Sequence, residues 1–134
     1  SFPVKKNEIS QAIISNQNNL KKIVKIVHPE VRSNPKNFIK KNKNRKVVVL
    51  DIPLLLENKI NTKKDILVFV DSKKVDIERR LIKRRNFNRK LFNKFKKIQF
   101  KLSYKKKKSH YIIKNNFTKK SIRRDINIIL KKIL

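Results

Sequence analysis

The clearest candidate for chemistry in this sequence is Asp51, a carboxylate that closes the apolar run at positions 47–50. Four hydrophobic residues followed by an aspartate are typical of nucleotide sites, where the carboxylate reaches a Mg²⁺ ion on the phosphates, usually through water. The alternative is structural, because aspartate also caps turns well, and Pro53 predicts that the chain turns here. Asp51 is therefore a candidate metal-site residue and a candidate turn residue.

Two pairs of basic residues are spaced by one helical turn. Arg80 and Arg84 fall in a segment that reads as one helix, so we expect both to project from the same face. Guanidinium groups suit a transferring phosphoryl group, whose negative charge is spread over three oxygens. His28 and Arg32 have the same spacing and would suit a phosphate or a ribose. The alternatives are a solvated cationic face for the arginines, and a helix-start cap with a surface charge for the second pair.

Three apolar runs predict the strands that would position these residues. The runs lie at 46–51, 65–71 and 110–116, and the first two each end on an acid. Because more than a dozen residues separate consecutive runs, we expect parallel strands with both faces covered. In parallel α/β sheets ligands lie beyond the carboxyl ends of the strands, which is where Asp51 would stand.

The rest of the chain has helical periodicity. Apolar spacing predicts a helix over 8–27 that breaks near 15–19, and Pro29 is suited to open a further helix, followed by a polar stretch at 33–46. The remaining predicted helices lie at 73–87, 88–101 and 118–134. Alternation of helices with apolar strands predicts an α/β domain with a mainly parallel sheet.

Composition sets broad limits on the class of protein. The 134 residues suffice for one small domain, and a formal net charge of +30 would by itself suggest a polyanion such as nucleic acid. The alternative is compositional drift, since Lys, Asn, Ile and Phe fill tolerant positions throughout. The absence of cysteine and of any apolar run of about 18 residues predicts a cytoplasmic protein with no membrane partner.

The order of several blocks resembles one family, dephospho-coenzyme A kinase. The blocks "HPEVR" and "DIPLLLE", in that order, are the most specific of them. The full set is "NEISQAIISNQNNLKKIVKIVHPEVR" at 7–32, "VVVLDIPLLLEN" at 47–58, "VFVDSKKVDIERRLIKRRNFN" at 68–88, "IQFKLSYK" at 98–105 and "HYIIKNN" at 110–116.

The resemblance implies a phosphate-loop (P-loop) NTPase fold of the nucleoside-monophosphate-kinase type, with a core sheet, a helical acceptor domain and a mobile lid. The implied reaction moves the γ-phosphoryl group of ATP to the ribose 3′-hydroxyl of dephospho-coenzyme A, with Mg²⁺ as cofactor. We expect a monomer or weak oligomer without a specific nucleic-acid partner. The expected segments of this one partial kinase domain are 1–45 (coenzyme A binding), 46–71 (core strands), 72–108 (lid and helices) and 109–134 (last strand and final helix).

The resemblance also assigns expected roles by position. Arg80 and Arg84 match the lid motif and would clamp phosphates as the lid closes and excludes water. Asp51 would serve the metal, and Asn115 and Asn116 begin the loop expected beside adenine. The residues expected to serve the acceptor are His28, Arg32, Glu57, Gln99 and Lys105.

Some positions depart from the family pattern. Ser109 and His110 stand where Ala-Asp is usual, Phe117 replaces the glycine that normally follows the asparagine, and Gln11 replaces an arginine common in the first helix.

The front of the family pattern is not found in these residues. The family begins with a strand, a glycine-rich phosphate loop and then an aspartate expected to act as base, and this chain has no glycine and no initiator methionine. We therefore expect the 134 residues to be a part of a longer kinase and to be inactive alone. The alternatives are a non-catalytic paralogue and a basic nucleic-acid-binding module.

Overall fold

The computed structural model describes residues 3–134, except for the side chains of residues 17, 28 and 30–32. The chain divides into two compact units, Ser1–Ile60 with Asn88–Gln99, and Asn61–Phe87 with Phe100–Leu134. The expected segment 72–108 is thus shared between the two units.

The first unit is helical and begins with α1 (Lys6–Ser15) and α2 (Gln17–Lys41). Asn16 separates them with an extended backbone (φ −142°, ψ 124°), and its side-chain oxygen accepts the backbone N–H of Asn18 at 2.9 Å. This asparagine ends one helix and caps the next, because its side chain satisfies a donor that helix geometry leaves open. The predicted break near 15–19 is confirmed.

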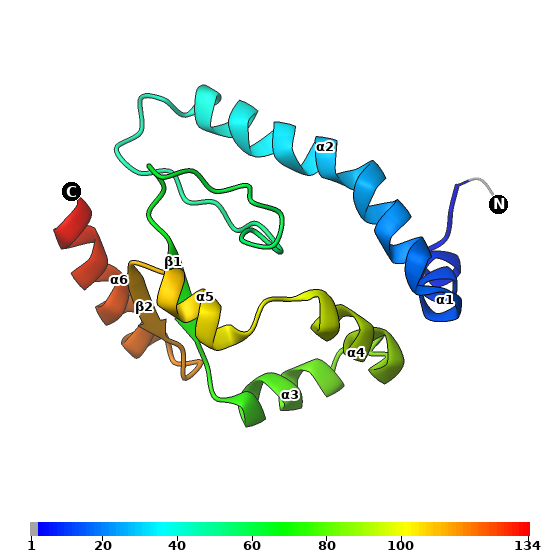
Figure 1. Cartoon of the computed structure of the whole chain (residues 1–134). Helices are drawn as coiled ribbons and strands as arrows, with labels where there is room; N and C mark the ends of the chain where they lie inside the picture. Colours follow the sequence, from blue (N-terminus) through cyan, green and yellow to red (C-terminus); the bar gives the residue numbers. More distant parts are fainter. Residues whose placement is uncertain (1–2) are drawn as a thin grey trace. The chain divides into compact units, whose positions relative to one another are not determined.

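The long helix α2 corrects two expectations (Figure 1). Pro29 does not open a new helix, because it lies inside α2 together with Pro35, and the helix reaches Lys41 through the expected polar stretch. A proline removes one hydrogen bond and crowds the preceding turn, but the turns on either side keep their own bonds. The fixed φ angle of proline suits the first turn of a helix, but a proline in the sequence does not by itself show that a helix starts there.

The third helix of this unit, α4 (Arg89–Ile98), packs on α1. Ile13 of α1 and Leu20 of α2 are buried, and the Lys94 ammonium of α4 donates to the carbonyls of Ile13 and Ile14 at 2.9 and 2.6 Å. These are last-turn carbonyls of α1, which lack partners within their helix and carry the negative end of its dipole. Lys94 therefore fastens α4 to the end of α1.

We expect Lys94→Met to lower the free energy of unfolding by about 1–2 kcal/mol, because it keeps the apolar stem and removes both charge-assisted bonds. Lys97→Met, at an exposed position of the same helix, is the matched control and should change stability little. Urea unfolding and amide exchange of α1 measure the difference. Equal stabilities of the two variants would contradict this role for Lys94.

The apolar run at 46–51 does not form the expected strand. Residues 47–52 have no regular secondary structure; Val47 and Val48 are half-buried, and Val49 is 81% exposed. A strand exists through hydrogen bonds to a neighbour, and no described residue offers this run a partner strand. The following residues, 53–59, form turns, as Pro53 had predicted.

The second unit contains a parallel pair of strands, β1 (Val68–Asp71) and β2 (Tyr111–Lys114). Val68 is paired with Tyr111 and Asp71 with Lys114, so the carboxyl ends of both strands lie at one edge. Two of the three predicted strands, and their parallel direction, are confirmed. The part of the chain that the structure describes is therefore α/β with a small parallel sheet (Figure 1).

Three helices belong to this second unit. They are α3 (Lys74–Ile82), α5 (Leu102–Lys108) and α6 (Lys119–Ile133), and α6 packs on β2 and buries Ile129. None of the helices in the described residues is long and apolar enough to cross a membrane.

Candidate nucleotide site

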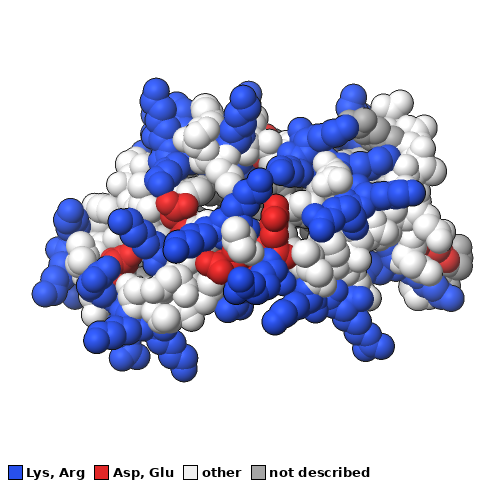
Figure 2. All heavy atoms as spheres, turned by 90° about the horizontal axis from the view of Figure 1, so that it is seen from below, with Lys and Arg blue, Asp and Glu red and all other residues white. Residues whose placement is uncertain are grey.

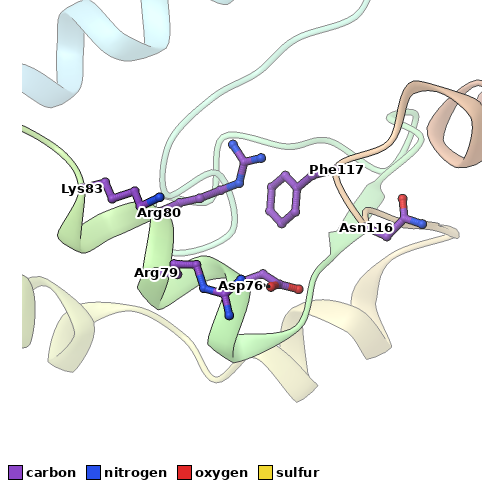
Figure 3. Close-up of a pocket in the computed structure, with 6 residues that line it drawn as sticks. All are labelled: Asp76, Arg79, Arg80, Lys83, Asn116 and Phe117. Carbon is purple, nitrogen blue, oxygen red and sulfur yellow. Dashed lines mark ion pairs between the residues drawn. The ribbon is translucent and has the colours of Figure 1, made fainter.

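A surface pocket of about 440 Å³ lies within the second unit. It joins α3 and the residues just after it to the loop between β2 and α6 (Figure 3). The lining residues are Asp76, Arg79, Arg80, Lys83, Asn116 and Phe117. Three cations, one carboxylate, one amide and one aromatic ring make this lining suitable for an anionic ligand with a flat polar group.

Two of the lining residues, Arg80 and Phe117, form a cation–π pair. The guanidinium carbon of Arg80 lies 3.8 Å from the ring centroid of Phe117, and Figure 3 shows the two groups side by side. Such a contact contributes about 0.5–1 kcal/mol at an exposed site. Asp76 lies 3.9 Å from Arg79 across one turn of α3 and offsets part of the positive charge. The structure thus brings Arg80 and the Asn116 loop, both predicted site elements, to one place.

Hydrogen bonds fix the loop that follows β2. The Asn115 backbone N–H donates to the Asp71 carbonyl at 2.7 Å, and its side-chain oxygen accepts the Phe117 N–H at 2.8 Å. The Asn116 oxygen accepts the backbone N–H of Thr118 and the hydroxyls of Thr118 and Ser121. Both asparagine oxygens therefore hold the loop and start α6, which leaves the Nδ2 donors as the groups suited to a base.

Arg84 does not share a helical face with Arg80, which corrects the prediction from spacing. Helix α3 ends at Ile82, and two turn bonds follow, from Arg84 N–H to Leu81 and from Phe87 N–H to the Arg84 carbonyl. Residues 83–86 form a turn, and Asn88 then begins the next helix by accepting the Leu91 N–H at 3.0 Å. Three adjacent cations after Ile82 also give a continued helix no apolar anchor.

A carboxylate at the carboxyl end of β1 is neutralised within the same unit. Asp71 Oδ2 lies 2.6 Å from the ammonium of Lys106 in α5. Lys105, which the resemblance assigns to the acceptor, is the preceding residue of α5. Asp71 is thus engaged in a partly exposed ion pair at the edge of the sheet where a ligand is expected.

Asp125 of α6 supports the same edge from the side of β2. Its Oδ2 accepts the backbone N–H of Lys114 at 3.0 Å, and its side chain is only 15% exposed. A backbone donor at the end of β2 would lose this partner without the carboxylate. Asp125 therefore links α6 to the strand that leads into the loop.

We expect Asp125→Ala to lower the free energy of unfolding by about 1–3 kcal/mol, because it leaves the Lys114 N–H without this acceptor. Asp125→Asn keeps an acceptor oxygen and should cost less, and Asn127→Ala, on the exposed part of the same helix, is the control. Urea titration of the three variants gives the comparison. If Asp125→Ala and Asp125→Asn lower the free energy of unfolding equally, the hydrogen bond to Lys114 is not the source of the stability.

The other predicted site residues lie in different places. Asp51 is exposed within the irregular segment of the first unit. His28 and Arg32 belong to α2, but their side chains lie outside the part of the chain that is described. Glu57 is half-buried among the turns, and Gln99 ends α4 as its C-cap.

No group of three or more His, Asp or Glu side chains that could hold a metal ion occurs among the described residues. Cationic side chains are spread across the face seen in Figure 2, with a few acidic side chains between them. The positive charge is therefore not gathered into one stripe on that face.

Sequence reasoning missed the ring of Phe117. The replaced glycine was the available signal, because the backbone at this position has φ 63°, a value that glycine adopts without strain. The replacement His110 likewise has a structural role: its Nδ1 accepts the Leu67 N–H at 2.9 Å, at the entry to β1.

A protein-family model described as dephospho-CoA kinase matches residues 3–121. The chain belongs to the dephospho-CoA kinase family. Curated relatives that carry that name include the following three. The protein of Bartonella henselae is 29% identical over 98% of this chain and 68% of its own length. The protein of Wolbachia pipientis wMel is 31% identical over 85% of this chain and 59% of its own length. The protein of Geobacillus kaustophilus is 34% identical over 92% of this chain and 63% of its own length.

The chain thus spans about three fifths to two thirds of the length of these dephospho-CoA kinases. The dephospho-CoA kinase match includes all six residues that line the pocket and ends near the start of α6. The resemblance found in the order of the sequence blocks is confirmed.

Proposed function

We propose that these residues belong to an ATP-dependent kinase that phosphorylates the ribose 3′-hydroxyl of dephospho-CoA, the final step of coenzyme A synthesis. The observation that carries the proposal is the pocket in which Arg80 of α3 meets the loop after β2, inside a chain of the dephospho-CoA kinase family. A P-loop kinase needs a cationic element over the phosphates and a loop beside the base. The pocket brings a cationic helix and a loop together in one compact unit, which supports the proposal.

The nucleotide side of the proposed site consists of α3 and the loop. Arg80 would bind phosphate oxygens. Arg84, in the turn after α3, would stabilise the transferring group when a lid closes. The Nδ2 groups of Asn115 and Asn116 would donate to ring nitrogens of adenine. The acceptor side is proposed to use His28, Arg32, Glu57, Gln99 and Lys105.

Asp51 fits one limited role toward Mg²⁺. The ion prefers oxygen ligands and keeps several waters, so a single exposed carboxylate is suited to contact it through water while phosphates supply other ligands. Mg²⁺ would neutralise charge that develops on the phosphates.

The chemistry also limits what these residues do alone. In the transfer, the 3′-oxygen forms a bond to the γ-phosphorus and loses its proton, while the bond to the bridging oxygen breaks and ADP leaves. A phosphate loop cradles the phosphates with inward backbone N–H groups, and none of the 134 residues is the glycine that such a loop uses. We propose that phosphoryl transfer needs a phosphate loop in addition to these residues. We also propose that the protein acts in the cytoplasm.

The site of phosphorylation tests the proposal directly. A protein that joins this chain to a phosphate-loop segment should convert dephospho-CoA into a product with a new ribose 3′-phosphate, visible by ³¹P NMR. Adenosine and AMP, offered as competing acceptors, control for acceptor choice. Phosphate on another hydroxyl, or equal use of adenosine, would contradict the assignment.

A further inference from the structure

The strained position in the loop after β2 is occupied by an aromatic residue. Phe117 has φ 63°, in the left-handed region where a bulky side chain is unfavourable, and its N–H is held by the Asn115 side chain at 2.8 Å. Residues kept in such conformations by their surroundings cluster at ligand sites. The ring at this position stands against Arg80, whose guanidinium carbon lies 3.8 Å from the ring centroid.

The ring is placed to contact a ligand. Phe117 is half-buried and lines the pocket, so part of its ring surface is accessible. Figure 3 shows the Arg80 guanidinium on one side of the ring and Asn116 on the other in that view. An aromatic surface between a cation and an amide suits a flat heterocycle better than an aliphatic chain.

The rest of the lining selects for negative charge. Arg79, Arg80 and Lys83 project from one stretch of chain, against a single carboxylate, Asp76. A ligand that uses both features carries a flat ring and phosphates at opposite ends. A purine nucleotide has this chemistry.

We propose that Phe117 is a specificity-determining residue, whose ring stacks on the purine of the nucleotide while the cations of α3 bind its phosphates. This inference rests on the nucleotide-binding role proposed above and adds a selection for the base. It predicts that the ring of Phe117 raises the affinity for ATP but not the affinity for a ligand that has phosphates and no base.

The experiment compares two probes on the 134-residue chain by isothermal titration calorimetry at about 150 mM salt, which weakens non-specific binding to a basic protein. The probes are MgATP and magnesium tripolyphosphate, and the quantity is the ratio of their dissociation constants. Phe117→Leu removes the ring and keeps the β-carbon and the backbone constraint. Phe117→Tyr keeps a ring, and Phe38→Leu, at an exposed position of α2, is the matched control.

We expect the chain to bind ATP more tightly than tripolyphosphate, and Phe117→Leu to reduce this preference by about fivefold. Tripolyphosphate affinity should stay unchanged in Phe117→Leu, which also shows that the cationic part of the pocket is intact. Phe117→Tyr and Phe38→Leu should keep the preference. An unchanged ratio in Phe117→Leu, tighter ATP binding in that variant, or an equal loss in Phe38→Leu overturns the proposal.

Because no acceptor is present, this result does not depend on transfer to dephospho-CoA. Failure of the stacking role would leave the kinase proposal standing. Failure of the kinase proposal would appear instead as the wrong product in the acceptor assay.

Discussion

The 134-residue chain alone is expected to transfer phosphate from ATP to dephospho-CoA at least about 10³-fold more slowly than a complete dephospho-CoA kinase. Removing a single preorganised donor from a transition-state site costs about 10²–10³ in turnover. This chain has no glycine, so we expect it to lack the whole loop of inward N–H donors that would hold the β- and γ-phosphates. The pocket at Arg80 and Phe117 would bind the nucleotide without orienting the group that is transferred.

A fusion protein tests the same prediction in the opposite direction, by adding a phosphate loop and measuring whether transfer appears. The residues of the Geobacillus kaustophilus dephospho-CoA kinase that precede its matched region would be joined before Ser1. Transfer should rise by at least about 10³-fold over the chain alone, because the phosphate loop and the lid would then act on the same triphosphate. Formation of ADP that requires dephospho-CoA, followed with a coupled assay, is the measurement.

Two controls define the outcomes of the fusion experiment. The same fusion with its phosphate-loop lysine replaced by alanine should be inactive, and circular dichroism of both fusions should agree. Transfer by the 134 residues alone near the rate of a complete relative would contradict the requirement for a phosphate loop. A folded fusion without transfer would favour the non-catalytic paralogue.

Arg84→Ala in the active fusion is expected to lower kcat by about 10²–10³ while changing the KM for dephospho-CoA by less than about threefold. The reason is that a guanidinium delivered by lid closure would strengthen its interaction as charge moves in the transition state. Arg84 lies in the turn that follows α3, where a small backbone change moves it without unwinding the helix. Steady-state kinetics with both substrates measure the change.

Arg85→Ala is the matched control for Arg84→Ala, because it removes the same charge from the next exposed position of the same turn. It should change kcat by less than about threefold. Arg80 is expected to act differently: it is already in place against Phe117, so Arg80→Ala should mainly weaken ATP binding. Unchanged turnover in Arg84→Ala would contradict a role for Arg84 in stabilising the transition state.

Much of the local structure follows from residues close together in the sequence. Asn16 ends one helix and begins another because its own side chain caps the new one. The runs that contain Val68–Asp71 and Tyr111–Lys114 are strands of the predicted direction, because β-branched residues and the long connection favour parallel pairing. The order of blocks also identified the family, since it records spacing that composition does not.

Other features depend on which segments meet. The apolar run before Asp51 has the pattern of a strand, yet strand formation requires hydrogen bonds to a neighbour, and the described residues provide none. Arg84 has helical spacing from Arg80, but α3 ends at Ile82 and Arg84 lies in the turn that follows.

The sequence by itself determined most of the helices, two of the strands, the family and the cationic character of α3. It did not determine α5 or the continuation of α2 past Pro29. Only the tertiary structure decided that Lys94 closes the end of α1 and that the ring of Phe117 lies on Arg80. Periodicity and capping are properties of neighbouring residues, so they can be read along the chain. Contacts between residues 37 or 80 positions apart depend on how the elements pack, which no local pattern specifies.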